Sequence, residues 1–461
     1  MGTGNKNAVV TEAAVTDQQA FTRRTSYGPS SPVIGSRGAQ TRQQVIDAAL
    51  ECFTEHGFHG TAVDDIAVRA ETSRATVYQY FESKEAVFIE LMNASGAALQ
   101  SLNRALGELG PTTAGYRNLH RWLQEWSWNF DRYAAMYIEW ANVNSQKTEL
   151  RPRIIAFVDS HTKRFSERLI AAGSDPGEAP TSALLVLAMA SRFNYIRHVY
   201  RPSTPDDQLV RSLASALQLF LFPDTPVSVL ADRSTPVESD DSNREPSKTV
   251  GGPLATLTTR KTVPASKSFE GLSPKAAKTV RELLDAAGRV FAMRGYDAAN
   301  IDHIVTEAGL ARGTFYRYFD NKLELITALA EEAAAAMCPI FEEFEKFGDH
   351  VDRSELTAWL HRFLDLHKRY AGVTRAWTEQ FPIDPPVLAP AADVVDAISR
   401  AVAATFGPPR PYVLGRGAAV MMLSSLLEHF PNEGLGAKHE PTDQQIVDAQ
   451  ARFIERVLLP R

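Results

Sequence analysis

Two short runs of the chain carry side chains of the kinds that recognise base pairs. Residues 74–81 read R-A-T-V-Y-Q-Y-F, and residues 312–319 read R-G-T-F-Y-R-Y-F. Arginine can bind guanine through two hydrogen bonds, glutamine can bind adenine, and a threonine methyl can contact thymine. The runs therefore predict contact with double-stranded DNA. The candidates for base reading are Arg74, Ala75, Thr76 and Gln79 in the first run, and Arg312, Gly313, Thr314 and Arg317 in the second.

Each run is predicted to be the second of two short helices joined by a tight turn. A stripe of apolar residues at helical spacing predicts a first helix over 42–56, ended by Gly57. The stripe consists of Val45, Ala49, Cys52 and Phe53. Thr61 and Asp64 have the spacing of a capping box that opens a short helix over 63–70. Ser73 then caps the helix of the first run, and a longer helix starts at Lys84 behind Ser83 or Glu82.

The second run lies in the same arrangement. A first helix is expected at about 280–294, ended by Gly295, and a second over 301–308, capped by Asn300. Gly309 makes the turn, and Ala311 stands where the first copy has the capping Ser73. Because alanine cannot cap, the second helix-turn-helix is expected to be less rigid.

The similarity of the two regions extends over whole arms of the chain. A shift of 238 residues aligns 41–84 with 279–322 without a gap, and a shift of 237 pairs residues further on, such as Trp122 with Trp359 and Phe193 with Phe430. A period this long indicates two copies of a complete domain.

The motif shared by both regions resembles the TetR family of bacterial transcriptional regulators. A first helix ends F-x-x-x-G-[FY], D-x-I-x-x-x-A follows, and R-x-T-x-Y-x-Y-F-x-x-K closes the motif, at 53–84 and again at 291–322. The resemblance implies an all-α fold with two tandem protomers. Each protomer would have an N-terminal three-helix head that binds DNA and a helical body that binds a small effector and dimerises.

The resemblance also implies residues that hold the DNA backbone. These positions are Thr76, Tyr78, Tyr80 and Lys84 in the first head, and Thr314, Tyr316, Tyr318 and Lys322 in the second. Such contacts fix the register of a protein on DNA and carry little sequence information. The residues leading into the two runs complete the set of candidate DNA contacts. They are Thr72, Ser73 and Ala311.

The two heads differ in charge. Residues 41–86 contain four basic and eight acidic residues, whereas residues 275–325 contain eight basic and seven acidic ones. The second head is therefore expected to hold DNA more strongly through long-range electrostatics. Gln79 in the first head and Arg317 in the second also predict unlike half-sites, so the operator is expected to be asymmetric, with heads about 34–36 Å apart.

Both bodies are rich in aromatic residues, which could line an apolar effector cavity or could be ordinary helix core. The candidates are Trp122, Trp126, Tyr133 and Trp140 in the first body, and Trp359, Tyr370 and Trp377 in the second. No His, Cys and carboxylate cluster has the spacing of a metal site, and no motif indicates a bound cofactor.

Composition shifts predict the domain boundaries. Residues 1–38 are expected to be a disordered tail and 223–272, rich in Pro, Gly, Ser and Thr, a flexible linker. Between them lie head one at 39–86 and body one at 87–222, and after the linker head two at 273–325 and body two at 326–461. The last two helices of each arm, at about 181–200 with 207–222 and 412–430 with 443–459, are expected to pair. Pairing within one chain gives a pseudo-dimer, and pairing between chains gives a further homodimer.

The remaining features indicate a cytoplasmic protein. The 461 residues are 44% hydrophobic and carry a net charge of -6, the N-terminus has no apolar core of a signal peptide, and no apolar run is long enough to span a membrane. The two cysteines are far apart and form no disulfide framework.

The sequence therefore predicts a DNA-binding transcriptional regulator, a repressor released by a small-molecule effector. The alternative is a small-molecule sensor or protein-interaction scaffold in which one or both heads no longer read DNA, an idea prompted by the acidity of head one. An enzyme is not expected, because no catalytic constellation is visible in the sequence.

Overall fold

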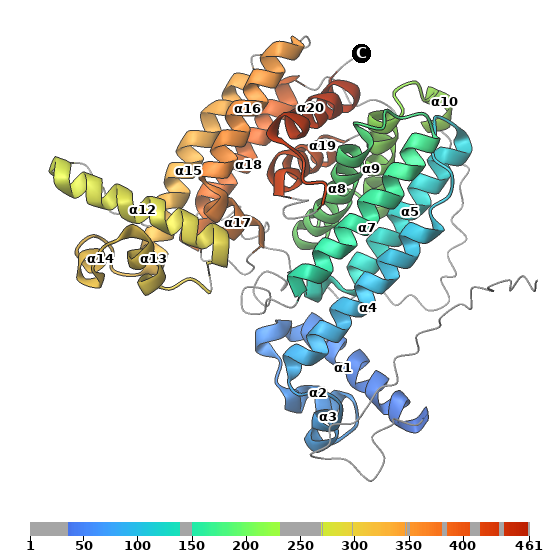
Figure 1. The fold of residues 1–461 in the computed structure, drawn as a ribbon, viewed down its shortest axis with the longest axis horizontal. Coiled ribbons are helices and arrows are strands. Elements are labelled where there is room, and N and C mark those ends of the chain that lie inside the picture. The colour runs from blue at the N-terminus through green and yellow to red at the C-terminus, as the bar shows by residue number, and fades with distance from the viewer. Residues whose placement is uncertain are drawn as a thin grey trace, which may run out of the picture. The chain divides into compact units, whose positions relative to one another are not determined.

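The computed structural model describes residues 36–138, 150–230, 269, 271–296, 298–345, 347, 351–379, 385–405, 415–432 and 438–459. Within these ranges the chain consists of helices and their connections, without a strand, so the all-α prediction is confirmed (Figure 1). The chain divides into two compact units, Met1–Phe88 and Ile89–Arg461. Neither Trp140 nor residues 231–268 of the predicted linker lie within the described residues.

The first unit contains head one. Its helices are α1 (Ser36–Gly60), α2 (Val63–Arg69) and α3 (Arg74–Tyr80), followed by the first residues of α4 (Lys84–Ala105). The predicted stripe on α1 is buried, and the rings of Phe53, Phe58 and Phe88 lie with centroids 5.2–6.2 Å apart. Cys52 is part of this core, and burial raises the pKa of its thiol. The aromatic cluster holds α1 against the start of α4.

One predicted helix cap of head one is wrong. Gly57 interrupts α1 with φ 72°, as expected for the end of a helix. The capping box of α2, however, uses the backbone N–H of Ala62, which donates to Asp65 Oδ2 at 2.7 Å. Thr61 faces inward instead, and its hydroxyl donates to the carbonyl oxygens of Cys52 and Gly57 at 3.1 and 2.8 Å. Thr61 thus satisfies carbonyls left open where α1 ends, rather than amides where α2 begins.

Head two forms part of the second unit. It comprises α12 (Pro274–Arg294), α13 (Ile301–Ala308), α14 (Arg312–Tyr318) and the first turns of α15 (Lys322–Glu345). Gly295 ends α12 with φ 76° and Gly309 ends α13 with φ 67°. Asn300 caps α13 as predicted, because its side chain accepts from the N–H of His303 at 2.8 Å. Phe291, Phe315 and Phe319 fill the centre of this head.

Body one is built from the rest of α4 and from five further helices. These are α5 (Thr113–Arg132), α7 (Leu150–Ala171), α8 (Ala179–Tyr200), α9 (Asp206–Leu221) and α10 (Val227–Leu230). Aromatic side chains hold α5 to α7, with the ring centroids of Trp122 and Phe165 at 5.5 Å and those of Trp126 and Phe157 at 6.3 Å.

Body two begins with the rest of α15, which packs along α18 (Pro385–Thr405). Between them in the chain lie α16 (Arg353–Arg369) and α17 (Ala371–Glu379). Two helices near the C-terminus each continue into a π-helical turn. The first is α19 (Arg416–Ser424) with η2 (Ser425–His429), followed by a 3-10 turn η3 (Phe430–Asn432), and the second is α20 (Asp443–Phe453) with η4 (Ile454–Leu458).

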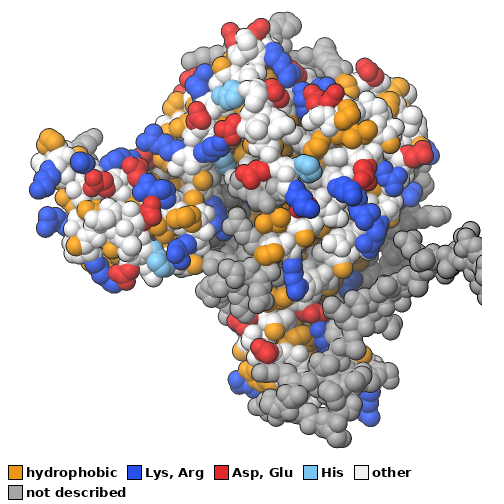
Figure 2. Space-filling model, viewed as in Figure 1, with side chains coloured by type: hydrophobic (Ala, Val, Ile, Leu, Met, Phe, Trp, Pro, Cys, Tyr) orange, Lys and Arg blue, Asp and Glu red, His pale blue; other side chains and the backbone are white. Residues whose placement is uncertain are grey.

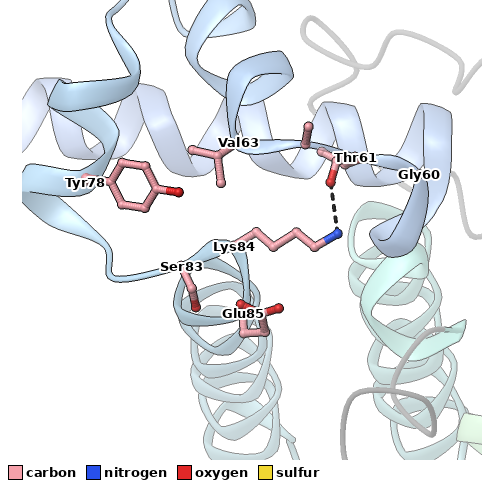
Figure 3. A pocket seen from close by; sticks show the side chains of 8 residues that line it. Gly60, Thr61, Val63, Tyr78, Ser83, Lys84 and Glu85 are labelled. Carbon is pink, nitrogen blue, oxygen red and sulfur yellow. Dashed lines mark hydrogen bonds between the residues drawn. The ribbon is translucent and has the colours of Figure 1, made fainter.

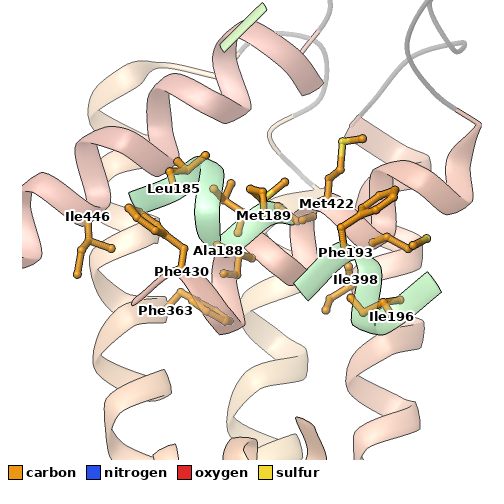
Figure 4. Packing of buried hydrophobic residues seen from close by; sticks show 14 of the residues in the cluster. Leu185, Ala188, Met189, Phe193, Ile196, Phe363, Ile398, Met422, Phe430 and Ile446 are labelled. Atoms are coloured by element: carbon orange, nitrogen blue, oxygen red, sulfur yellow. The ribbon is translucent and has the colours of Figure 1, made fainter. Parts of the chain in front are cut away.

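The two bodies pack against each other within the second unit. Helix α8 contacts α19, η2 and α20, while α9 contacts α19 and η4. Figure 4 shows apolar side chains of α8 meeting those of the second body, among them Met189 and Phe193 from α8 and Met422, Phe430 and Ile446 from the other side. We call this surface the arm interface. It joins the segments predicted to pair and buries a continuous apolar layer.

The described residues also refine the predicted boundaries. Helix α1 begins at Ser36, within the segment expected to be a tail. The start of the predicted linker is folded, because α10 buries Val229 and Leu230. Near its other end, the Phe269 ring lies 5.4 Å from that of Phe319 in head two. Both ends of the segment 223–272 thus bury apolar side chains on the neighbouring domains.

In the described part of the chain, no helix combines the length and the apolar character needed to cross a membrane. Nor do these residues include three or more His, Cys, Asp or Glu side chains placed together as a metal site.

Candidate nucleic-acid interface

The second short helix of each head has one buried face and one exposed face. Val77 anchors α3 and is 2% exposed, whereas Phe315 anchors α14 and is fully buried. The opposite faces carry the predicted base-reading residues. Arg74, Ala75, Arg312, Gly313 and Arg317 are exposed, and Thr76, Gln79 and Thr314 are partly exposed. Both helices therefore present these residues to a partner, as a helix in a major groove must.

The caps of these two helices differ as predicted. The Ser73 hydroxyl accepts from the N–H of Thr76 at 3.1 Å at the start of α3. Ala311 occupies the same place before α14 and offers no side-chain acceptor. Since a missing N-cap removes a hydrogen bond from the first turn, α14 is held less firmly at the end that would enter the groove.

An arginine at the first position of each helix is paired in the same way. Arg74 binds Asp64 at 2.9 Å, and Arg312 binds both carboxylate oxygens of Asp302 at 2.8 Å. The pKa of each guanidinium is raised by a hydrogen bond to the tyrosine one turn later and by the nearby carboxylate. The tyrosine is Tyr78 for Arg74 and Tyr316 for Arg312. The ion pairs are exposed, so they orient the arginines without burying them and contribute little to stability.

The lysines of the motif are bound within their own heads. Lys84 Nζ donates to the carbonyl oxygens of Phe58 and Thr61 at 2.7 and 3.0 Å. Lys322 Nζ donates to those of Tyr296 and Ala299 at 2.6 and 2.9 Å. In each head the ammonium also lies over an aromatic ring, at 4.5 Å from Phe58 and 4.1 Å from Tyr296. The observed role of both lysines is to fasten the fourth helix to the loop before the second.

A shallow groove of about 450 Å³ opens beside these groups in head one (Figure 3). It is lined by Gly60–Val63, by Tyr78 from α3, and by Ser83–Glu85 at the start of α4. Figure 3 shows the Tyr78 hydroxyl directed toward the groove and Lys84 reaching Thr61 on its far wall. The groove brings together Tyr78 and Lys84, two of the residues predicted to hold the DNA backbone. Helix N-termini on its walls favour an anion, whereas Glu85 on its rim opposes one.

Charges of both signs cover head two. Figure 2 shows Lys and Arg side chains mixed with acidic ones over the lobe of α12, α13 and α14. Some of these arginines are paired, as Arg289 is with Glu307 at 2.7 Å. In head one, Arg69 binds Glu51 and Glu55 at 2.9 and 2.6 Å. Such pairs neutralise part of the acidity of head one on the side of α1 and α2.

Head two is fastened closely to its own body. Helix α17 packs on α12, and a Cβ added at Gly372 would lie 2.5 Å from the carbonyl oxygen of Gly288. Arg375 donates to the carbonyl oxygen of Ala292 at 2.8 Å. A second link runs through Glu332 on α15, which accepts from Arg281 of α12 at 2.7–2.8 Å and from Tyr370 at 2.7 Å. The first helix of head two is therefore joined to both α17 and α15 by direct contacts.

Comparison with known proteins identifies these heads. Residues 45–91 and 283–329 both match the sequence family described as bacterial regulatory proteins, tetR family. Both heads belong to the TetR family. The matches contain α2 and α3 with the start of α4, and α13 and α14 with the start of α15. The predicted resemblance of both heads to the TetR family is confirmed, as is the presence of two tandem copies.

Relatives of these TetR heads include regulators from several bacteria. The chain is 34% identical over 71 residues to the uncharacterised regulator YdgC of Bacillus subtilis, covering 15% of this chain and 36% of YdgC. It is 33% identical over 91 residues to the repressor AcnR of Corynebacterium diphtheriae, covering 19% and 48%. The chain thus spans half or less of the length of these relatives. The solved TetR-family regulator PfmR of Thermus thermophilus is 22% identical, with 38% of this chain and 96% of PfmR covered and a TM-score of 0.31.

The aromatic residues predicted to line effector cavities behind the TetR heads are packed in the cores of the bodies. The described members, Trp122, Trp126, Tyr133, Trp359, Tyr370 and Trp377, are each at most 8% exposed. The indole N–H groups of Trp122, Trp359 and Trp377 donate to Asn103, Ile340 and Val387 at 2.8–3.0 Å. These contacts are what core packing requires, and a role in effector binding stays a prediction.

Sequence reasoning missed the aspartates that orient the recognition arginines. Asp64 and Asp302 are identical at the shift of 238, as are Arg74 and Arg312. Each aspartate lies in the first turn of the second helix, ten residues before its arginine. The internal repeat indicates this pairing, because the acidic position and the basic position are the same in both copies. The sequence alone does not separate this role of Asp64 from that of a helix cap, because both place a carboxylate in the first turn of a helix.

Proposed function

We propose that the chain is a sequence-specific DNA-binding transcriptional regulator that reads DNA with two unlike TetR heads. The observation that supports this best is the arginine at the start of α3 and of α14, exposed and oriented by an aspartate in both heads. The same arginine–aspartate pairing at two places 238 residues apart favours a shared task over an incidental surface charge. A regulator that acts on DNA would work in the cytoplasm, which is the location that we propose.

The DNA contacts that we propose come from the predicted set, but we give its members different roles. Arg74, Thr76 and Gln79 would read bases in head one, and Arg312, Thr314 and Arg317 in head two. Tyr78 and Tyr316 would hold phosphates. Lys84 and Lys322 would act mainly through the loop that they fasten, since each ammonium is already bound to two carbonyl oxygens.

Repression is the favoured mode of regulation. The relatives AcnR of Corynebacterium diphtheriae and IcaR of Staphylococcus aureus are described as a repressor and a negative regulator, and the matches of 91 and 102 residues are longer than one head. A repressor needs only to occupy its operator. Release by a small effector would require a change in the bodies that reaches the heads, and the fastening of α12 to α17 and α15 provides such a route in arm two.

The operator of such a protein would be asymmetric. Gln79 and Arg317 occupy equivalent positions of the two recognition helices and prefer different bases. The arm interface would hold the heads as a pseudo-dimer, so that one chain covers two unlike half-sites about one turn of DNA apart. A pair of chains with four heads is the competing assembly, and the mass of the protein on a single operator distinguishes the two.

The experiment that tests the proposal is selection of bound fragments from genomic DNA by the full-length protein, followed by footprinting. Titrations of a selected fragment then compare Arg317→Ala with Arg289→Ala, which removes the same charge from α12 of the same head. Loss of a base-reading arginine should cost about 1–3 kcal/mol and relax the preference at one position, whereas Arg289→Ala should weaken all sequences slightly and equally.

Three outcomes would separate the hypotheses. Equal affinity for selected and random duplexes at physiological salt would refute sequence-specific regulation. Protection of one half-site that depends on Arg312 and not on Arg74 would show that head one no longer reads DNA. A selection without enrichment, in a protein whose unfolding responds to small molecules, would favour the sensor or scaffold instead.

A further inference from the structure

The arm interface carries two ion pairs, one buried within its apolar layer and one at its exposed edge, where the Glu178 side chain is 50% exposed. Arg192 on α8 lies 3.7 Å from Glu428 in η2, and their side chains are 7% and 19% exposed. Arg452 on α20 lies 2.6 Å from Glu178, which immediately precedes α8. Both pairs join arm one to arm two, so their partners are supplied by different copies of the repeat.

Neither pair is reproduced by the symmetry of the repeat. At the shift of 237, Arg192 corresponds to His429 and Glu428 to Ser191. Arg452 corresponds to Ser215 and Glu178 to Gly415. A symmetric dimer contains each of its contacts twice, once on either side of the axis. Here each ion pair occurs once, because the equivalent positions carry no matching charges.

Two further contacts of the interface are also one-sided. The rings of Phe220 and Phe453 have centroids 5.6 Å apart, and Arg456 donates to the carbonyl oxygen of Phe220 at 2.6 Å. The equivalents of the phenylalanines are Val457 and Ala216. The backbone differs as well, since η2 and η4 widen the helices of arm two where α8 and α9 run on without interruption.

Pairing of like arms would lose these contacts. In a pair of two first arms, Arg192 would face Ser191 in place of Glu428 and would have no carboxylate partner. In a pair of two second arms, Glu428 would face His429 in place of Arg192 and would have no arginine partner. Burial already raises the pKa of Glu428, while Arg192 counteracts this effect. An unpaired charge at this depth is strongly destabilising, whereas the same charge with its partner is tolerated.

We propose that Arg192–Glu428 and Arg452–Glu178 make the arm interface selective for unlike arms, so that α8 and α9 accept the second arm and reject a copy of the first. The selectivity gives the proposed two-headed regulator a fixed pair of unlike heads. The pairing itself does not depend on DNA binding, and its test contains no DNA. Failure of the DNA experiment and failure of this one are therefore distinguishable.

The first test is a charge-reversal cycle in the full chain. Arg192→Glu and Glu428→Arg each place like charges together and should lower the midpoint of thermal unfolding, and the double reversal should regain at least half of the loss. The matched control is Arg362→Glu, which breaks the exposed pair with Glu343 away from the interface and should change the midpoint little. A double reversal no more stable than the worse single variant would overturn the proposal.

The second test measures partner choice directly. A protease site placed within 231–268 allows purified full chain to be cut, unfolded in urea and refolded, so that the halves pair anew. Native mass spectrometry should find pairs of unlike halves in at least tenfold excess over pairs of like halves. A 1:2:1 mixture of the three pairs would overturn the proposal.

Glu428→Gln keeps the shape of the side chain and removes its charge, so it serves if a reversed variant fails to fold. In the cut protein it should reduce the excess of unlike pairs at least threefold. An excess unchanged by this substitution would show that apolar packing alone selects the partner and would equally overturn the proposal.

Discussion

The close approach of α17 to α12 gives a quantitative test of how head two is held. Gly372 lies at the start of α17, and a Cβ there would be 2.5 Å from the carbonyl oxygen of Gly288, 2.9 Å from the Cβ of Phe291 and 3.0 Å from the backbone N of Ala292. Two of the three atoms belong to the backbone of α12, so no side-chain rotation can relieve the clash. The substitution Gly372→Ala must push the two helices apart.

The expected cost follows from the packing of this contact. Overfilling a well-packed site by one carbon costs typically about 1–3 kcal/mol. Gly288→Ala is the matched control on the facing helix, because a Cβ at that position meets no atom within 4 Å. Alanine should stabilise the interior of α12 by roughly 0.5–1 kcal/mol relative to glycine. Both substitutions add one methyl group to this pair of helices, Gly372→Ala inside the contact and Gly288→Ala outside it, and they should have opposite effects.

Urea unfolding and DNA titration together measure the effect. Gly372→Ala should lower the unfolding midpoint and weaken binding to the half-site read by head two, while leaving the half-site of head one unaffected. Gly288→Ala should raise the midpoint or leave it unchanged. If Gly372→Ala matches the wild type in both assays, or if both alanines are equally harmful, the close-approach argument is refuted.

Three further outcomes are expected. Lys322→Met deprives two carbonyl oxygens of their donor and should cost about 1–3 kcal/mol in urea unfolding, whereas the exposed Lys278→Met should cost little, and equal effects would contradict the fastening role. Ala311→Ser supplies the missing cap of α14 and should raise stability by about 1 kcal/mol, with hydrogen exchange of the α14 amides slowed; faster exchange would speak against it. Burial lowers the pKa of His120 and His367 to about 4. Below about pH 6.5 these histidines therefore bind protons in the unfolded chain but not in the folded one. The free energy of unfolding should fall by roughly 2 kcal/mol per histidine between pH 7.5 and 5. His367→Gln should flatten this pH dependence in urea titrations, and an unchanged slope would count against burial as its cause.

Local patterns predicted the heads because their helices depend on near neighbours. The apolar stripe of α1, the glycine that ends it and the Asn300 cap all follow from spacings of a few residues. The internal repeat then gave each head an independent copy for comparison. The same local patterns do not predict the role of Thr61. A hydroxyl between two helix ends can bond to either of them, and only the packing of the loop decides which.

Contacts between distant parts of the chain were beyond sequence reasoning. Lys84 matched a motif position, but its acceptors lie 23 and 26 residues away in a loop whose path depends on the folded head. The π-helical turns η2 and η4 leave no signature in the apolar period, since they depend on the surface against which the helices pack. The packed ends of the linker depend likewise on hollows formed by other elements, into which Leu230 and Phe269 fit.

The one-sided arm interface has a consequence for how such a protein can evolve. In a dimer of identical chains every substitution arises on both sides of the axis, so a harmful change destabilises the interface twice. Two equivalent positions also always carry the same residue, so they can never form a pair of opposite charges. In this chain a substitution arises once, and its compensation can arise in the other arm, as Glu428 matches Arg192. Joining two copies in one gene thus opens mutational paths that symmetry closes, and the heads carried by the two arms become free to diverge in the bases that they prefer.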